Sequence, residues 1–204
     1  MSIELASRLI VFEGIDGSGK STQLELLHAR LLRAGLTVTA TREPGGTHVG
    51  ELVREILLSA KGTRLLPMSE LLLFLVSRSQ VTSEVILPAL GRGDVVICSR
   101  YRMSSVAFQG YGRGLDRSMI ERLNETVTQG IRPDVLFLID VPTEVALARL
   151  GGDGDRIERE ALAFHERVRQ GYLELAAATP EAVVVDGTRP AAEIAVTLTS
   201  HLGL

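Results

Sequence analysis

Apolar and polar positions along the chain fall into two alternating patterns. Short apolar runs, typical of strands buried on both faces of a sheet, alternate with longer segments in which apolar residues recur every three or four positions, typical of amphipathic helices. The short runs lie at residues 9–12, 36–40, 95–98, 135–139 and 182–185. We therefore predict an α/β fold in which helices flank a five-stranded parallel sheet in three layers.

The helical pattern is clearest between the first two apolar runs. Leu24, Leu27 and Leu31 share one face there, and Gly35 follows where a helix is expected to end. The segment 68–90 is apolar almost all round at residues 71–76, which predicts a helix buried inside the molecule. Further helices are predicted near residues 119–129, 143–150, 158–177 and 191–202. No linker or repeat interrupts this order, so we expect residues 1–204 to form a single domain.

Composition narrows the class of protein. The 204 residues are 45% hydrophobic and 23% charged, as is typical of a folded globular chain. The net charge of −3 argues against a protein that coats nucleic acid or an anionic membrane, although it permits a local basic cleft. A single cysteine, Cys98, excludes an internal disulfide and a cysteine-based zinc site. No apolar run suits a signal peptide or a bilayer span, so we expect a cytoplasmic protein without nucleic-acid or membrane partners.

A glycine-rich segment directly follows the first predicted strand and opens the first predicted helix. It matches the phosphate-binding loop of nucleotide-triphosphate proteins in full: Gly14, Ile15, Asp16, Gly17, Ser18, Gly19, Lys20 and Ser21. In such a loop, backbone N–H groups and the helix N-terminus face the phosphates, the lysine reaches the outer phosphates and the hydroxyl holds Mg²⁺. A chance glycine turn is the alternative, but the flanking strand and helix favour an ATP site that extends to Thr22.

A nucleotide-triphosphate site alone leaves a molecular switch, a motor and a small-molecule kinase open. A guanine-nucleotide switch is expected to carry an Asn-Lys-x-Asp segment that reads the base. The chain contains no such segment, which argues against the switch.

Several short motifs together resemble the thymidylate kinase family. After the phosphate loop come Thr-Arg-Glu-Pro-Gly-Gly-Thr at 41–47, Ser-Arg-Tyr at 99–101, Asp-Arg-Ile-Glu at 155–158 and Asp-Gly-Thr-Arg-Pro at 186–190. Phe74 with Arg78, and Ser-Ser at 104–105 leading to Phe-Gln-Gly at 108–110, also match. Each piece is weak alone, but the ordered set is specific and spans nearly the whole chain. The resemblance implies a P-loop kinase fold, ATP and dTMP as substrates, Mg²⁺, and a homodimer.

The resemblance also implies how the acceptor nucleotide is held. Arg42 and Arg100 follow predicted strands, where open parallel sheets bind ligands, and are expected to hold the acceptor phosphate; pairing with surface acids is the alternative. Phe74 and Arg78 lie one helical turn apart, so one is expected to stack on the base and the other to donate to its carbonyl edge. Plain core packing is the alternative for Phe74. Ser105, Phe108 and Gln109 are expected to surround the base and sugar.

On the donor side, the resemblance implies a short lid at residues 149–157 that closes over ATP. Because the phosphate loop has no arginine, the lid should supply one to the transferring phosphoryl group, and Arg156 is the first choice. A salt bridge with Asp153 or Glu160 is the alternative for Arg156. Arg149 and Arg189 are expected to contact ATP. Lys20, Arg100, Arg156 and Asp16 make up the expected catalytic set.

The chain departs from the family at Ser99, where an acid usually precedes the arginine after the third strand. We expect Asp16 and Ser21 to hold Mg²⁺ instead, although Asp16 fits equally the start of a helix or a contact near the sugar 3′-hydroxyl. Asp140 also follows an apolar run, but we predict a role at the start of the next helix.

The expected reaction is in-line transfer of the γ-phosphoryl group of ATP to the phosphate of dTMP, without a covalent intermediate. A kinase for another nucleoside monophosphate and a regulatory protein that hydrolyses ATP slowly are the alternatives. Release of ADP that depends on dTMP, on another monophosphate or on neither separates the three.

Overall fold

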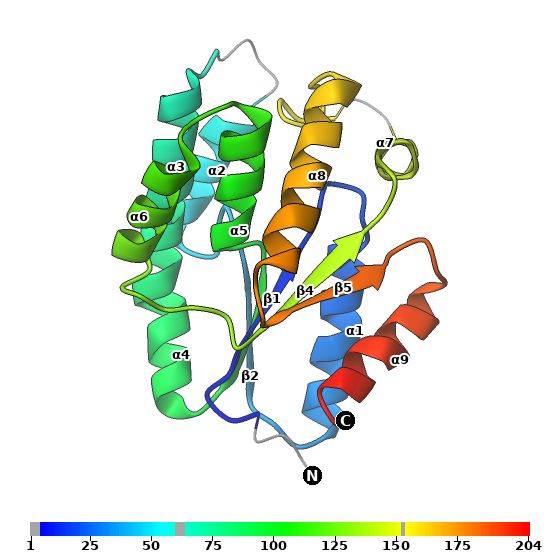
Figure 1. Cartoon of the computed structure of the whole chain (residues 1–204). Helices are drawn as coiled ribbons and strands as arrows, with labels where there is room; N and C mark the ends of the chain where they lie inside the picture. Colours follow the sequence, from blue (N-terminus) through cyan, green and yellow to red (C-terminus); the bar gives the residue numbers. More distant parts are fainter. Residues whose placement is uncertain (1–4, 60–63, 152–153) are drawn as a thin grey trace.

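The computed structural model describes residues 5–59, 64–151 and 154–204, and these form one parallel sheet of five strands in the order β2-β3-β1-β4-β5 (Figure 1). The strands are β1 (Leu9–Glu13), β2 (Val38–Arg42), β3 (Val95–Ser99), β4 (Val135–Asp140) and β5 (Ala182–Asp186). All five predicted strands are confirmed. The second begins two residues later than expected, because Val38 is the first residue of β2 in register with β3, opposite Val95.

Helices cover both faces of the sheet, so the predicted three-layer α/β architecture is confirmed (Figure 1). They are α1 (Lys20–Arg33), α2 (His48–Leu58), α3 (Pro67–Val81), η1 (Thr82–Ile86), α4 (Leu87–Arg92), α5 (Arg102–Ser105), η2 (Val106–Gly112), α6 (Arg117–Val127), α7 (Thr143–Leu150), α8 (Leu162–Ala177) and α9 (Ala191–His201).

Two helical segments were not expected from the sequence. The α5–η2 segment is buried on nearly every side, including its polar residues Ser104, Ser105 and Gln109, so it lacks the one-sided apolar pattern of a surface helix. Helix α2 follows the 41–47 motif directly, and Thr47 caps it by accepting a hydrogen bond from the Gly50 backbone. Both segments lie beside the carboxyl edge of the sheet, so both contribute to the cavity described below.

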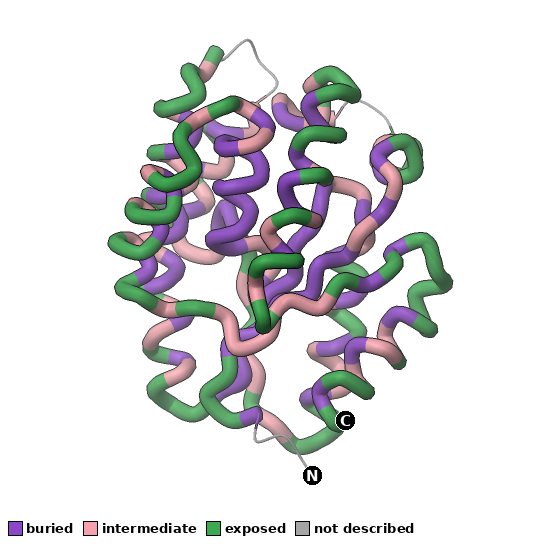
Figure 2. The backbone as a smooth tube through the Cα atoms, in the orientation of Figure 1, coloured by how far each residue is buried: buried purple, intermediate pink, exposed green. Residues whose placement is uncertain are grey.

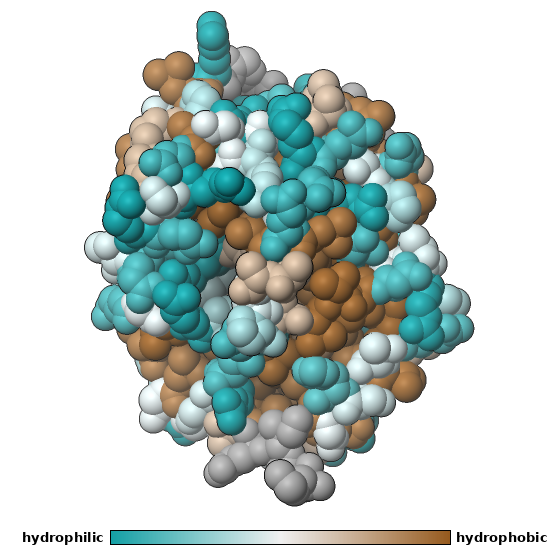
Figure 3. Space-filling model, in the orientation of Figure 1, coloured by the Kyte–Doolittle hydropathy of each residue, from teal (hydrophilic) through white to brown (hydrophobic). Residues whose placement is uncertain are grey.

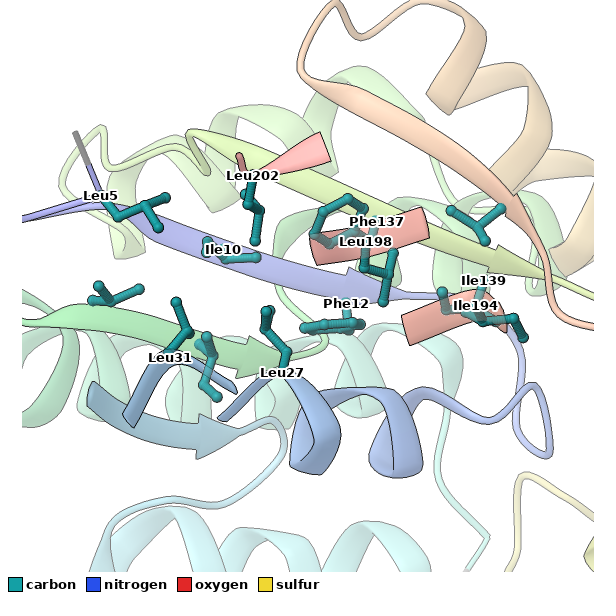
Figure 4. Packing of buried hydrophobic residues seen from close by; sticks show 13 residues of the cluster. Leu5, Ile10, Phe12, Leu27, Leu31, Phe137, Ile139, Ile194, Leu198 and Leu202 are labelled. Atoms are coloured by element: carbon teal, nitrogen blue, oxygen red, sulfur yellow. The ribbon is translucent and has the colours of Figure 1, made fainter. Parts of the chain in front are cut away.

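Side-chain alternation along the strands divides the core between the two faces of the sheet. Ile10 and Phe12 of β1 pack with α1 and α9, in the apolar cluster of Figure 4. Their neighbours Leu9 and Val11 face the opposite layer and pack against the helix that runs through α3, η1 and α4. Cys98 lies in that second cluster, and burial raises the pKa of its thiol well above the usual value.

The predicted helix at 68–90 is confirmed as a continuous helical stretch, Pro67–Arg92. By length and mean hydropathy this stretch could cross a membrane, a test that core helices of globular proteins also pass. Here it packs against α2 and α6 and carries the fully buried Arg78. The expectation that it is buried on all sides was wrong, because Leu72 and Val76 of the apolar 71–76 stretch are 49% and 45% exposed. We interpret it as a helix that packs one side into the core.

The surface pattern matches this arrangement. In Figure 2 the central strands β1 and β4 and helix α5 are largely buried, whereas α6 and α9 expose their outer faces. Strand β5 is an edge strand with a half-exposed Val184, and Figure 3 shows hydrophobic surface in this region of an otherwise mostly hydrophilic face.

Candidate active site

A cavity of about 510 Å³ opens at the carboxyl edge of the sheet. This is the edge where open parallel sheets bind their ligands. The cavity walls come from the phosphate loop, the segments after β2 and β3, helices α2, α3 and η2, and the segment after α7. Its lining includes Asp16, Gly17, Gly19, Lys20, Ser21, Thr22, Arg42, Glu43, Pro44, Arg54, Leu58, Phe74, Ser99, Arg100, Ser104, Ser105, Phe108, Gln109, Arg149, Leu150, Asp155, Ile157 and Glu158.

The glycine-rich loop has the backbone that a phosphate cradle requires. Gly14, Gly17 and Gly19 all have positive φ, and a Cβ at Gly17 would collide with the carbonyl oxygen of Ala146. Lys20 folds back over the loop, and its Nζ donates to the carbonyl of Ile15 at 2.7 Å. The loop is therefore shaped for an anion, with its lysine held by a bond that a phosphate oxygen can replace.

The charge state of Lys20 is finely balanced. Burial and then the repulsion of Arg100 lower its pKa to about 7, against the opposing attraction of Asp16 and Glu13. Negative phosphates in the loop would favour the charged form and raise this pKa again.

Arg100 is the most extensively held cation of the cavity. Its Nη2 donates to Asp16 at 2.6 Å, and its guanidinium lies over the Phe108 ring, 4.9 Å from the ring centre. Burial raises the pKa of Asp16, but the nearby charges of Arg100 and Lys20 outweigh it and the net shift is downward. The Asp16–Arg100 pair thus keeps both groups charged within one side of the cavity.

Two further arginines approach from the β2 side. Arg42 makes a two-point ion pair with Glu51 at 2.8 and 3.0 Å, both partly exposed, as the alternative interpretation of Arg42 foresaw. It nevertheless lines the cavity together with Arg54, whose Nη1 donates to the Pro44 carbonyl. Burial and the neighbouring Arg42 lower the pKa of Arg54. The sequence analysis did not identify Arg54. The signal that could have found it is its position on α2, the helix that directly follows the 41–47 motif.

The expected base-binding residues divide between two places. Phe74, Ser105, Phe108 and Gln109 line the cavity as predicted. Arg78 does not line it. Its guanidinium makes five contacts with protein acceptors: Nε and Nη2 with Glu43 at 2.7 and 2.6 Å, Nη2 with the Tyr101 carbonyl, and Nη1 with Ser105 and Asn124. Direct donation from Arg78 to a base stays a prediction, and it requires one of these partners to be exchanged.

The cationic residues expected at the donor side also differ in placement. Arg149 lines the cavity, with its guanidinium near the Gly17 and Gly187 carbonyls at 3.5 and 3.1 Å. Arg189 pairs with Glu193 on the surface and does not line the cavity. Its predicted contact with ATP remains a prediction.

Arg156 is held by groups outside the cavity lining. It donates to Glu70 at 2.7 Å and to the Leu57 carbonyl at 2.9 Å. Arg156 therefore forms a salt bridge, as the alternative held, but its partner is Glu70. Glu160, one of the two expected partners, pairs with Arg113. The other, Asp153, lies outside the described residues, as does residue 152 of the predicted lid. The catalytic role of Arg156 stays a prediction.

The candidate metal ligands are Ser21 and Asp16, and both line the cavity with Ser99. Asp140 makes a two-point ion pair with Arg169 at 2.7 and 2.8 Å. The predicted role of Asp140 at the start of the next helix was wrong, because α7 begins at Thr143 after Pro142. Among the described residues there is no cluster of three acidic, histidine or cysteine ligands. Mg²⁺ needs no such cluster, since it is commonly held by one or two carboxylates plus substrate phosphates and water.

Comparison with known proteins shows the family of the chain. The sequence model of thymidylate kinase matches residues 12–197. The thymidylate kinase of Geobacter sp. (strain M21) is 52% identical over 188 residues, which cover 88% of this chain and 84% of that protein. The chain belongs to the thymidylate kinase family. The thymidylate kinase of Pelotomaculum thermopropionicum is 49% identical over 91% of this chain and 88% of its own length.

The fold of the family is shared as well. The crystal structure of thymidylate kinase from Ehrlichia chaffeensis matches with a TM-score of 0.79 and 34% identity, covering 98% of this chain and all of the other. The thymidylate kinase resemblance inferred from the motifs is confirmed, and with it the P-loop kinase fold.

The lowered pKa of Lys20 leads to a prediction about proton uptake. At pH 8 the free enzyme holds Lys20 mostly neutral, and ATP should recharge it, so binding should take up close to one proton and weaken as pH rises above about 7. Calorimetry in buffers of different ionisation enthalpy measures this uptake. In Lys20→Arg, whose side chain stays charged, the uptake should disappear; its persistence would assign the proton to another group.

Proposed function

We propose that this protein transfers the γ-phosphoryl group of ATP to the 5′-phosphate of dTMP, giving dTDP and ADP. The proposal depends on one observation. The phosphate loop and the aromatic side chains of Phe74 and Phe108 line the same cavity. Membership of the thymidylate kinase family supports dTMP as the acceptor. ATP would occupy the loop around Lys20, and the base of dTMP would lie against Phe74.

The chain's own residues would act by positioning and by neutralising charge. The acceptor oxygen is already an anion, so no general base is needed. Arg100 and Arg42 hold the acceptor phosphate, and Lys20 holds the outer phosphates of ATP. Arg149 lines the cavity beside the loop, so we place it nearer the donor phosphates than Arg156, which Glu70 holds.

Mg²⁺ is proposed as the cofactor, and the donor set suits it. The Ser21 hydroxyl and the second carboxylate oxygen of Asp16 would hold the ion, which would then neutralise phosphate charge. Asp16 shares its other oxygen with Arg100, so the same carboxylate orients the acceptor clamp.

An acceptor panel tests the function directly. ADP release should be strongly stimulated by dTMP and little by other nucleoside monophosphates. Phe74→Ala should raise the KM for dTMP by about tenfold, since stacking of a base on an aromatic ring contributes about 1–3 kcal/mol, and should leave the KM for ATP unchanged. The variant's unfolding temperature shows whether it is folded. Equal stimulation by all monophosphates, or by none, would replace dTMP kinase by one of the two alternative functions.

Ser99, where the family usually has an acid, provides a test of the Mg²⁺ proposal. Ser99→Asp adds a carboxylate beside Asp16 and Arg100, and it should lower the Mg²⁺ concentration at half-maximal rate several-fold. Asp16→Asn should raise it. The titrations are made at saturating ATP and dTMP. If neither variant shifts the midpoint, neither position organises the metal.

We also propose a homodimer through the outer face of α2 and α3. Six apolar residues on these packed helices are more than one third exposed: Val49, Leu52, Ile56, Met68, Leu72 and Val76. Exposed apolar side chains that gather on two packed helices, rather than lying singly, suit a protein interface. A cytoplasmic location and the absence of nucleic-acid and membrane partners remain predictions of the sequence.

Leu72→Glu should convert the dimer to a monomer, because it places a charge in the proposed apolar contact. Sedimentation velocity or light scattering measures the mass. Leu32→Glu is the matched control, since Leu32 is equally exposed, at 51% against 49%, but lies on α1. A monomeric wild type, or the same effect from both variants, would contradict the proposed interface.

A further inference from the structure

The direction of the Arg100 side chain is not set by a relaxed backbone. Arg100 directly follows β3 and has φ of 69°, in the left-handed region that side-chain-bearing residues rarely adopt. Contacts at both ends of the guanidinium hold it in place. Asp16 binds Nη2 at one end, and Nη1 at the other end donates to the Gly14 carbonyl at 3.0 Å, the Tyr172 hydroxyl at 3.0 Å and the Ser104 hydroxyl at 3.3 Å.

Behind these two hydroxyls lies the carboxylate of Glu13, which is fully buried at the end of β1. Its Oε2 accepts from the Ser104 hydroxyl at 2.6 Å and from the Tyr172 hydroxyl at 3.0 Å. Its Oε1 accepts from the backbone N–H groups of Tyr101 and Ser104. The carboxylate is thus held by four donors, which come from α5, from α8 and from Tyr101, the residue before α5.

Hydrogen counting shows how the Tyr172 hydroxyl faces Arg100. A guanidinium can only donate, so the Tyr172 oxygen must accept from Nη1 of Arg100. The single hydrogen of the Tyr172 hydroxyl then points either to Glu13 or to the Ser104 hydroxyl, which lies 2.8 Å away. In both arrangements Arg100 donates to Tyr172, and Tyr172 stays bound to the group behind it.

We propose that Tyr172 is a positioning residue for the acceptor phosphate, acting through Arg100. Helix α8 carries Tyr172 and would thereby contribute to an acceptor clamp whose other parts come from β1 and β3. The inference rests on the proposed role of Arg100. Among the described residues, the hydrogen bonds of Arg100 use Nη1 and Nη2, so Nε remains available to an acceptor phosphate.

Tyr172→Phe removes this one hydroxyl and keeps the ring, which packs edge-on against Phe108. The KM for dTMP, and its dissociation constant by calorimetry, should rise about tenfold, the size expected for one lost hydrogen bond to a charged group. The KM for ATP should stay within about twofold, because no bond to the phosphate loop lysine is lost. Tyr111→Phe is the matched control. It removes a tyrosine hydroxyl that donates to Glu174 of α8, the helix that carries Tyr172, and among the described residues this hydroxyl makes no hydrogen bond to Arg100.

A double-variant comparison tests whether the effect runs through Arg100. In an Arg100→Ala background, Tyr172→Phe should cause no further loss of dTMP affinity. An undiminished loss in that background, an equal loss for ATP and dTMP, or wild-type dTMP affinity in Tyr172→Phe would each overturn the positioning role. If Arg100→Ala itself binds dTMP as well as wild type, the acceptor-site assignment fails first, and the two failures are thereby distinguished.

Glu13→Gln changes the other hydrogen-bond partner of the Tyr172 hydroxyl. It is the second test variant if Tyr172→Phe proves too unstable to assay. An amide nitrogen facing Tyr172 would donate to its oxygen, which would then be shared between the amide and Arg100, while the hydroxyl hydrogen turns to Ser104. A loss of dTMP affinity is expected, together with a loss of ATP affinity, because Glu13 also attracts Lys20. Unchanged dTMP affinity in folded Glu13→Gln would overturn the proposal.

Discussion

Repulsion between Lys20 and Arg100 is the constraint on which the rest of the site depends. A phosphotransfer cavity must collect cations before any phosphate arrives, and two buried cations destabilise each other and the folded state. Here Asp16 and Glu13 lie near both, and their attraction opposes the shift that burial and Arg100 impose on Lys20. The carboxylates come from β1 and the loop after it, so one continuous stretch of chain supplies both the cradle and its counter-charges.

The parallel sheet makes that arrangement geometrically simple. Because all five strands run the same way, the residues that follow β1, β2 and β3 meet at one edge, and Arg42, Ser99 and Arg100 lie there with the phosphate loop. Helices α1 and α9 fill the opposite face of the sheet with an apolar cluster that contains none of the cavity residues. The fold thus places an apolar core on one side of the sheet. The buried polar side chains Arg78, Ser105 and Gln109 lie on the helices of the other side.

Periodicity and motif spacing were sufficient for the strands and for the phosphate loop, because both are local features of the chain. They could not place Arg78 or Arg156. Phe74 and Arg78 share a helix face, yet one lines the cavity and the other lies beneath it, because Glu43 and Asn124, 35 and 46 residues away, bind the guanidinium. Arg156 is likewise held by Glu70, a partner far along the chain. The family resemblance supplied the acceptor, which no pattern of single residues could have named.

The burial of Cys98 also has a practical meaning for spectroscopy. It is the chain's single cysteine, it lies on β3 and packs toward the helix that runs through α3, η1 and α4, and its thiol stays protonated at neutral pH because burial raises its pKa. Thiol-reactive dyes act on exposed thiolates. The unaltered chain should therefore react little with such dyes, so a cysteine introduced on the surface near Arg149 would carry a single fluorophore whose emission reports changes in its own surroundings.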